Sequence, residues 1–176
     1  MDSRTVFVET SSPEETHFLG EALARGSYPG LALLLCGDLG SGKTEMVRGF
    51  MARWGYHQVR SPSFALVHEY PTAPPVVHVD LYRLSTLREE DGLGLEEYLL
   101  RGSVLLVEWG EKWKTHPLQD LWEGDFSFLG DFSLSGISCR RRVALRAWGN
   151  RAQDALDRSL AWFCAKGCST MRNGGR

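Results

Sequence analysis

The sequence has little of several features that mark other classes of protein. Its formal net charge is only −2 at pH 7, so no global excess of positive charge favours nucleic acid. Its four cysteines include no C-x-x-C pair and complete no zinc site. Its apolar runs are much shorter than a bilayer span, and its first residues lack the apolar core of a secretory signal. We therefore expect a cytoplasmic protein with reduced thiols and no membrane partner.

Length and composition are those of one globular domain. The chain has 176 residues and 43% hydrophobic content, which is enough to bury a core but short for two domains. Strand-like apolar runs alternate with amphipathic segments, which predicts the α/β class. We predict a single P-loop NTPase-like domain over residues 1–164, with a mixed central sheet flanked by helices. We expect the polar residues 165–176 to form a disordered tail.

The most informative feature is a glycine-rich segment, Gly37-Asp38-Leu39-Gly40-Ser41-Gly42-Lys43-Thr44. It fits the phosphate-loop pattern G-x-x-x-x-G-K-[ST]. The apolar run 31–36 before it predicts a strand, and residues 43–54 after it predict a helix that stops at Gly55. In this context, backbone N–H groups and the helix N-terminus converge on a phosphate chain. We predict that Lys43 contacts the β- and γ-phosphates of a nucleotide and that Thr44 holds Mg²⁺.

Local patterns predict the remaining elements. Further strands are expected at residues 5–10, 64–70, 76–82, 104–107, 126–134 and 142–148. A short proline-rich connection joins 64–70 to 76–82, which favours an antiparallel pair. Helices are expected from a capping box at Ser12 to about Arg25, in two pieces over 89–101, and from Asn150 onward. Residues 112–124 are predicted to be a loop with a short helical turn. On periodicity alone, Tyr82 and Trp109 are predicted to be core aromatics.

A nucleotide site needs an acidic anchor for Mg²⁺ besides Thr44, and the usual source is a carboxylate at the end of a neighbouring strand. Two residues qualify, because Glu108 ends the run 104–107 and Asp80 follows 76–79. The strand before Glu108 is the more apolar, so we predict that Glu108 holds the metal directly or through water. Either acid is expected to orient the attacking water. The segment Ser61-Pro62-Ser63-Phe64 is either a γ-phosphate sensor or a capped proline turn.

Five further motifs follow the phosphate loop in order: Arg48-Gly49-Phe50, Ser61-Pro62-Ser63-Phe64-Ala65-Leu66-Val67, Val79-Asp80-Leu81-Tyr82-Arg83-Leu84, Gly94-Leu95-Glu96-Glu97-Tyr98-Leu99 and Val107-Glu108-Trp109-Gly110-Glu111. Together they resemble the TsaE family, also called YjeE, over about residues 5–160. These are bacterial ATPases needed for the threonylcarbamoyl modification of tRNA adenosine next to the anticodon. The resemblance implies ATP on residues 40–44, Mg²⁺ near Thr44 and Glu108, and ATP hydrolysis that resets the TsaB–TsaD heterodimer. It implies that tRNA is involved only indirectly.

The predicted site residues fall into three groups. The catalytic residues are Lys43, Asp80 and Glu108, and the metal ligands are Thr44 and Glu108. The nucleotide-binding residues are Asp38, Leu39, Gly40, Ser41, Gly42, Lys43, Thr44 and Glu45, with Ser12 and Arg140 as candidates for the adenine pocket. Glu45 stands where the family usually has a second threonine, and its carboxylate near the phosphates would lower nucleotide affinity. Ser63 replaces a usual threonine but keeps the hydroxyl. Arg83 is either an arginine finger or a surface ion-pair partner.

Two other functions share the phosphate loop. A small-molecule kinase would need an arginine-rich lid and an acceptor pocket, and residues 55–100 show no such lid. A nucleotide-gated binding module with little turnover would carry the same motifs as an ATPase. The sequence alone does not separate this second alternative from a Mg²⁺-dependent ATPase.

Overall fold

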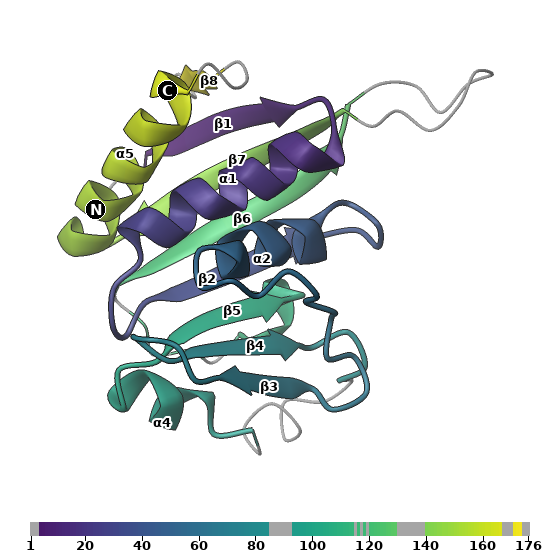
Figure 1. Cartoon of the computed structure of the whole chain (residues 1–176), viewed down its shortest axis with the longest axis vertical. Helices are drawn as coiled ribbons and strands as arrows, with labels where there is room; N and C mark the ends of the chain where they lie inside the picture. Colours follow the sequence, from purple (N-terminus) through teal and green to yellow (C-terminus); the bar gives the residue numbers. More distant parts are fainter. Residues whose placement is uncertain are drawn as a thin grey trace.

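The computed structural model describes residues 4–84, 93–114, 116, 118, 120–129, 140–166 and 171–173. One sheet runs through the described chain, with helices packed against it (Figure 1). Its strands are β1 (Thr5–Thr10), β2 (Ala32–Gly37), β3 (Val67–Tyr70), β4 (Val76–Asp80), β5 (Val104–Glu108), β6 (Leu121–Phe128), β7 (Arg141–Trp148) and β8 (Met171–Asn173). The helices are α1 (Pro13–Gly26), α2 (Lys43–Ala52), α4 (Leu95–Leu100), α5 (Asn150–Ala165) and the 3₁₀ turn η1 (Gly110–Lys112).

The sheet is mixed, as predicted. Its strand order is β3-β4-β5-β2-β6-β7-β1-β8. The central strands β4, β5, β2 and β6 are parallel, whereas β3 and the β7-β1-β8 group run antiparallel to their neighbours. The expected antiparallel pairing of β3 with β4 is therefore confirmed. Because β4, β5 and β2 are parallel neighbours, their carboxyl ends meet at one edge of the sheet.

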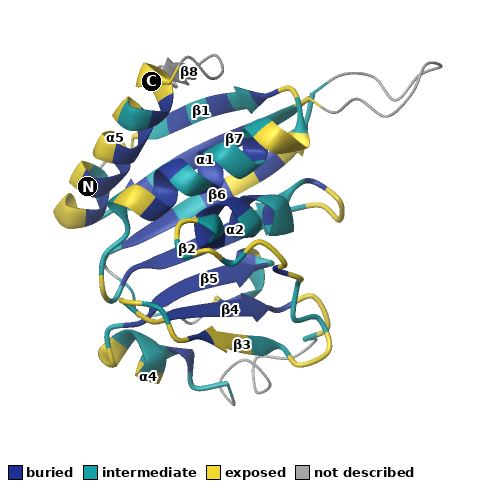
Figure 2. Ribbon diagram, viewed as in Figure 1, coloured by how far each residue is buried: buried dark blue, intermediate teal, exposed yellow. Residues whose placement is uncertain are grey.

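The sheet is covered on both faces. Helices α1, α2 and α5 share a core with Leu33 and Leu35 of β2, whereas α4 packs with Ala32 and Leu34 on the opposite face. Successive side chains of a strand point to opposite faces, so β2 contributes to both cores. Figure 2 shows the central strands β2, β4 and β5 as almost wholly buried. This burial explains why these strands read as continuous apolar runs.

The ends of the first two helices follow their local sequence signals. Ser12 caps α1, since its side chain accepts a hydrogen bond from the Glu15 amide at 3.2 Å. The Glu15 carboxylate reaches back past the cap and accepts a hydrogen bond from the Ser11 amide at 2.7 Å, one residue before the N-cap amide that the capping box predicts. Helix α2 ends at Ala52, and Gly55 follows with a φ of +80°. These findings confirm the predicted cap at Ser12 and the stop signal.

Two predicted strands are wrong in their bounds. Strand β3 begins at Val67 rather than residue 64, because Leu66 has a φ of +65° and its amide closes a turn on the Pro62 carbonyl. Strand β6 begins at Leu121, inside the predicted loop 112–124, and ends at Phe128. Pairing on both sides with β2 and β7 outweighs the weak strand propensity of its glycine and acidic residues. Residues 130–134 and the first piece of the predicted helix 89–101 include positions outside the described residues.

The last described strand lies within the segment that is expected to be a disordered tail. Residues Met171–Asn173 form β8, which pairs antiparallel with β1 opposite Val6, Phe7 and Val8. Without β8 this side of β1 would be an unpaired sheet edge, which gives the short strand a physical role. No helix among the described residues is long and apolar enough to cross a membrane.

Candidate functional site

The site lies where the parallel strands end. The sheet register places Leu35 of β2 opposite Glu108 of β5, and Glu108 opposite Asp80 of β4. Both acids are 3% exposed, and Glu108 stands on the strand directly beside the one that leads into the phosphate loop. The two predicted acids and the phosphate loop are therefore brought together by the strand order.

The phosphate loop adopts a conformation that depends on glycine. Gly40 and Gly42 have φ values of +75° and +111°, a region that side chains disfavour. Gly42 is the N-cap of α2 and supplies no side-chain hydrogen bond to the helix. The Ser41 hydroxyl is buried without a hydrogen-bond partner among the described residues. The first N–H groups of α2 and this hydroxyl are thus donors suited to an anion.

Lys43 is folded back over the loop. Its ammonium donates hydrogen bonds to the carbonyl oxygens of Gly37 at 2.5 Å and Asp38 at 2.8 Å, and lies 4.0 Å from the centre of the Trp109 ring. Burial lowers the pKa of Lys43, whereas the carboxylates of Glu108 and Glu111 oppose that shift. The lysine is therefore a shielded positive charge at the entrance to helix α2.

Glu108 joins the phosphate-loop helix to the buried strand β4. The Thr44 hydroxyl lies 2.9 Å and 2.8 Å from its two carboxylate oxygens. The ring nitrogen Nε2 of His78, a fully buried residue, lies 2.9 Å from Oε1 of the same carboxylate. Because a carboxylate accepts, His78 donates from Nε2 in this contact, and its Nδ1 has no partner among the described residues. Thr44, Glu108 and His78 form one polar chain through the base of the site.

Asp80 holds the segment that follows residue 60. The Ser61 hydroxyl donates a short hydrogen bond to one Asp80 carboxylate oxygen, and the Tyr82 amide donates to the other at 2.9 Å. The Asp80 amide in turn donates to the Leu66 carbonyl at 2.9 Å. Asp80 thus contacts the first residue of the Ser61–Phe64 segment and also Leu66, two residues beyond its end.

These groups line a cavity of about 500 Å³. Its lining includes residues 39–45 of the phosphate loop and helix α2, Ser61, Asp80 and Glu108. Tyr82 and Trp109 also line it, with ring centres 5.0 Å apart, and Tyr82 is 48% exposed. The prediction of a core aromatic is wrong for Tyr82, but Trp109 is half-buried and packs against the core on the α4 side of the sheet. Because β5 ends at Glu108 and Trp109 takes a left-handed φ of +61°, the indole lies at the edge of this core and also lines the cavity.

The other predicted residues take different positions. Glu45 lines the cavity, but Asp38, Ser12 and Arg140 do not. Pro13 and Arg141, the chain neighbours of Ser12 and Arg140, do line it. Arg140 pairs with Glu9 at 3.4 Å on the exposed surface. Arg83 lines the cavity and its guanidinium lies 4.1 Å from the centre of the exposed Phe64 ring. Sequence reasoning missed His78 and Arg141 altogether. One pattern in the sequence could have indicated His78. Side chains of a strand alternate between its two faces, so His78 and Asp80, two residues apart, lie on the same face.

The donor set fits a nucleotide with Mg²⁺. The Thr44 hydroxyl and the Glu108 carboxylate are hard oxygen ligands of the kind that Mg²⁺ prefers. No group of three or more His, Cys, Asp or Glu side chains suited to a metal occurs in the described part of the chain. A Mg²⁺ ion bound here would therefore need oxygen ligands from phosphates and water, as is usual for this ion.

A family model agrees with this geometry. The model described as "Threonylcarbamoyl adenosine biosynthesis protein TsaE" matches residues 10–128, more than half of the chain. This chain belongs to the TsaE family.

Curated relatives and a solved structure support the assignment. The tRNA threonylcarbamoyladenosine biosynthesis protein TsaE of Bacillus subtilis is 41% identical over 102 residues, which are 57% of this chain and 63% of the relative. The protein of that name from Rickettsia bellii is 38% identical over 116 residues, 63% of this chain and 76% of the relative. The chain spans less than two thirds of the length of some relatives, such as 53% of the Haemophilus influenzae protein.

The likeness in three dimensions is more extensive. The crystal structure of YdiB from Bacillus subtilis superposes with a TM-score of 0.75 at 28% identity, and covers 92% of this chain and 98% of that one. The α/β, P-loop NTPase-like fold is thus shared over nearly the whole TsaE-family chain.

Proposed function

We propose that this TsaE-family chain is a Mg²⁺-dependent ATPase that supports threonylcarbamoyl modification of tRNA adenosine next to the anticodon. The observation that carries this proposal is the contact between Thr44 at the start of α2 and the buried Glu108 at the end of β5. A phosphate loop needs a strand-end acid beside its hydroxyl to anchor a metal, and here the two groups touch.

Each side chain has a role that follows from its place. Lys43 would move its ammonium from the Gly37 and Asp38 carbonyls to the phosphates, where it offsets negative charge. Thr44 and Glu108 would hold Mg²⁺, which when bound neutralises charge on the phosphate oxygens. Asp80, whose carboxylate accepts from Ser61 and which lines the cavity, would orient a water molecule there. These residues would position the nucleotide and the water molecule and would neutralise negative charge on the phosphates, which is most of what phosphoryl transfer requires.

The partner proposal rests on the family. We propose that ATP hydrolysis resets a heterodimer of TsaB and TsaD in the cytoplasm, and that tRNA meets this chain only through that complex. The chain's mild net charge of −2 favours a protein partner over direct tRNA binding.

Phosphate release measured with and without the heterodimer tests the proposal. We expect slow release by the chain alone, faster release with TsaB and TsaD, and association that is stronger with ATP than with ADP or no nucleotide. Lys43→Ala is the control that removes phosphate binding. Association that depends on ATP without phosphate release would support the binding-module alternative. Equal association in all three nucleotide conditions, or tight tRNA binding by this chain alone, would contradict the proposal.

A further inference from the structure

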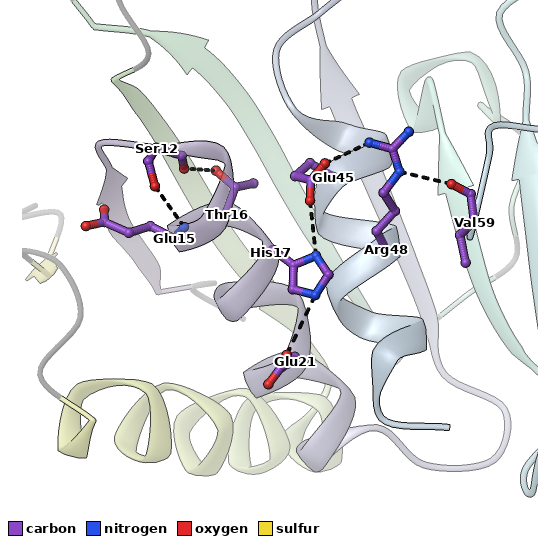
Figure 3. A network of polar contacts seen from close by, with 8 residues as sticks. All are labelled: Ser12, Glu15, Thr16, His17, Glu21, Glu45, Arg48 and Val59. Atoms are coloured by element: carbon purple, nitrogen blue, oxygen red, sulfur yellow. Dashed lines mark hydrogen bonds and ion pairs between the residues drawn. The ribbon is translucent and has the colours of Figure 1, made fainter. Parts of the chain in front are cut away.

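One arginine of helix α2 joins the nucleotide cavity to a segment that has little backbone support. Arg48 lines the cavity, yet the proposed ATPase chemistry gives it no role. Its Nη1 donates to Oε2 of Glu45 at 2.7 Å, and its Nε donates to the Val59 carbonyl at 2.9 Å. Figure 3 shows the guanidinium between these two groups, with Glu45 and Val59 on opposite sides.

The segment that Arg48 holds lacks regular hydrogen bonding. Backbone hydrogen bonds after α2 end with the Tyr56 amide and resume at the Pro62 carbonyl. No backbone–backbone hydrogen bond involves residues 57–61, all of which the structure describes. Two polar contacts from other elements fix this stretch: Arg48 binds the Val59 carbonyl, and Asp80 binds the Ser61 hydroxyl.

The two contacts lie only two residues apart. One comes from the helix that starts at the phosphate loop, and the other from the strand-end acid of the cavity. The buried Val59 side chain anchors the segment to the core, and Arg48 supplies the hydrogen-bond donor that the Val59 carbonyl needs. Ser61 thus lies two residues after a backbone group that is held both by the core and by Arg48.

The Arg48 side chain is itself held in place. Glu45, one turn earlier on α2, accepts from Arg48 through Oε2 and contacts Nδ1 of His17 through Oε1 at 3.0 Å. His17 lies on α1 at a close helix contact, where a Cβ on Gly49 would come within 1.7 Å of the His17 carbonyl oxygen. Charge-assisted hydrogen bonds of this length are about twice as strong as neutral ones. The His17–Glu45–Arg48 network thus ties the guanidinium to two packed helices (Figure 3).

We propose that Arg48 is a positioning residue that places the Ser61 hydroxyl against Asp80 at the cavity wall by holding the Val59 carbonyl, with Glu45 orienting its guanidinium. The proposal rests on the proposed ATPase for its effect on turnover. Its structural part is that Arg48 holds residues 57–61 in place. This part depends only on the contacts described above and can be measured without any ATPase assay.

Limited trypsin digestion measures that structural part. Arg60 is exposed in the segment, so the Arg60–Ser61 bond is cut when the segment opens far enough to enter the protease. Arg48→Gln should speed this cleavage about tenfold, the factor that corresponds to one lost hydrogen bond from a charged group. Glu45→Gln should give a smaller increase. Arg53→Gln, at the end of the same helix but outside the cavity lining, should change the rate less than about twofold. Unchanged cleavage in Arg48→Gln would overturn the inference.

Nucleotide measurements test the functional part. Arg48→Gln should lower ATP turnover about tenfold, because Ser61 and Asp80 serve the reacting end of the nucleotide. It should lower ADP affinity by a clearly smaller factor, which reflects the Glu45 charge that Arg48 no longer neutralises. Combined with Ser61→Ala, the loss should be clearly less than the product of the two single effects. Multiplicative effects, or an equal loss of ADP affinity, would show that Arg48 does not act through Ser61. Absence of turnover in the unchanged protein would refute the proposed ATPase, and the digestion would still decide the role of Arg48.

Discussion

Replacing Glu108 by glutamine tests the centre of the proposed site. The substitution keeps the side-chain shape and one acceptor oxygen but removes the charge. Glu108 accepts from the Thr44 hydroxyl at 2.8–2.9 Å and from Nε2 of His78 at 2.9 Å. The new NH2 group donates and cannot accept, so one buried donor loses its partner at a cost of about 1–3 kcal/mol. Relief from burying a charge offsets part of that cost, so we expect a net loss of stability below about 2 kcal/mol.

The effect of Glu108→Gln on turnover should be much larger than its effect on stability. A neutral amide is a poor Mg²⁺ ligand, and the loss of about 3 kcal/mol of metal and transition-state stabilisation corresponds to roughly a hundredfold lower kcat. Glu111→Gln is the matched control, since Glu111 is an exposed residue of η1 that does not line the nucleotide cavity. We expect it to retain at least half of the activity. The assay is Mg²⁺-dependent phosphate release, with urea unfolding measured in parallel. Turnover by Glu108→Gln above about a tenth of the unchanged protein would refute the reasoning.

Three further substitutions or modifications give separable outcomes. Lys43→Ala should abolish ATP binding measured by calorimetry while the protein stays folded by circular dichroism; unchanged affinity would contradict the phosphate-loop assignment. Asp80→Asn should lower kcat about tenfold, since one oxygen can still accept from the Tyr82 amide but the charge facing Ser61 is lost; an unchanged kcat would remove Asp80 from the reaction. Burial and the nearby Glu111, Glu123 and Asp125 carboxylates raise the pKa of the Cys36 thiol. At pH 8, Cys36 should therefore be alkylated far more slowly than the exposed Cys164 in a peptide-mapping experiment; equal rates would refute this.

Much of the site could be predicted because its signals are local. The phosphate loop is contiguous in sequence, and the strand before it and the helix after it are each marked by their own pattern. Glu108 and Asp80 could be predicted from the sequence for a different reason. Parallel strands end at one sheet edge, so an acid after an apolar run is brought to the same place as the loop.

The parts that the sequence did not predict depend on contacts distant in the chain. Periodicity predicts that Trp109 packs in the core, but it does not predict that the indole also lines the cavity, because this depends on the end of β5 at Glu108 and on the left-handed backbone of Trp109. The start of β6 at Leu121 depends on two neighbouring strands, and the pairing of β8 with β1 joins opposite ends of the chain. His78 lies in an apolar strand, and its contact with Glu108 exists only because β4 and β5 are neighbours.

The structure also changes the effect on nucleotide affinity that we expect from Glu45. The sequence alone places an extra carboxylate next to Thr44, where it would repel phosphates. In the fold, both of its oxygens are in contact with nitrogen groups: Oε1 with Nδ1 of His17 and Oε2 with the Arg48 guanidinium (Figure 3). A carboxylate bound to a guanidinium presents less negative charge to its surroundings than an isolated one. The predicted loss of affinity is therefore partly offset within the protein, and the residue that departs from the usual threonine instead helps to hold Arg48 above the Val59 carbonyl.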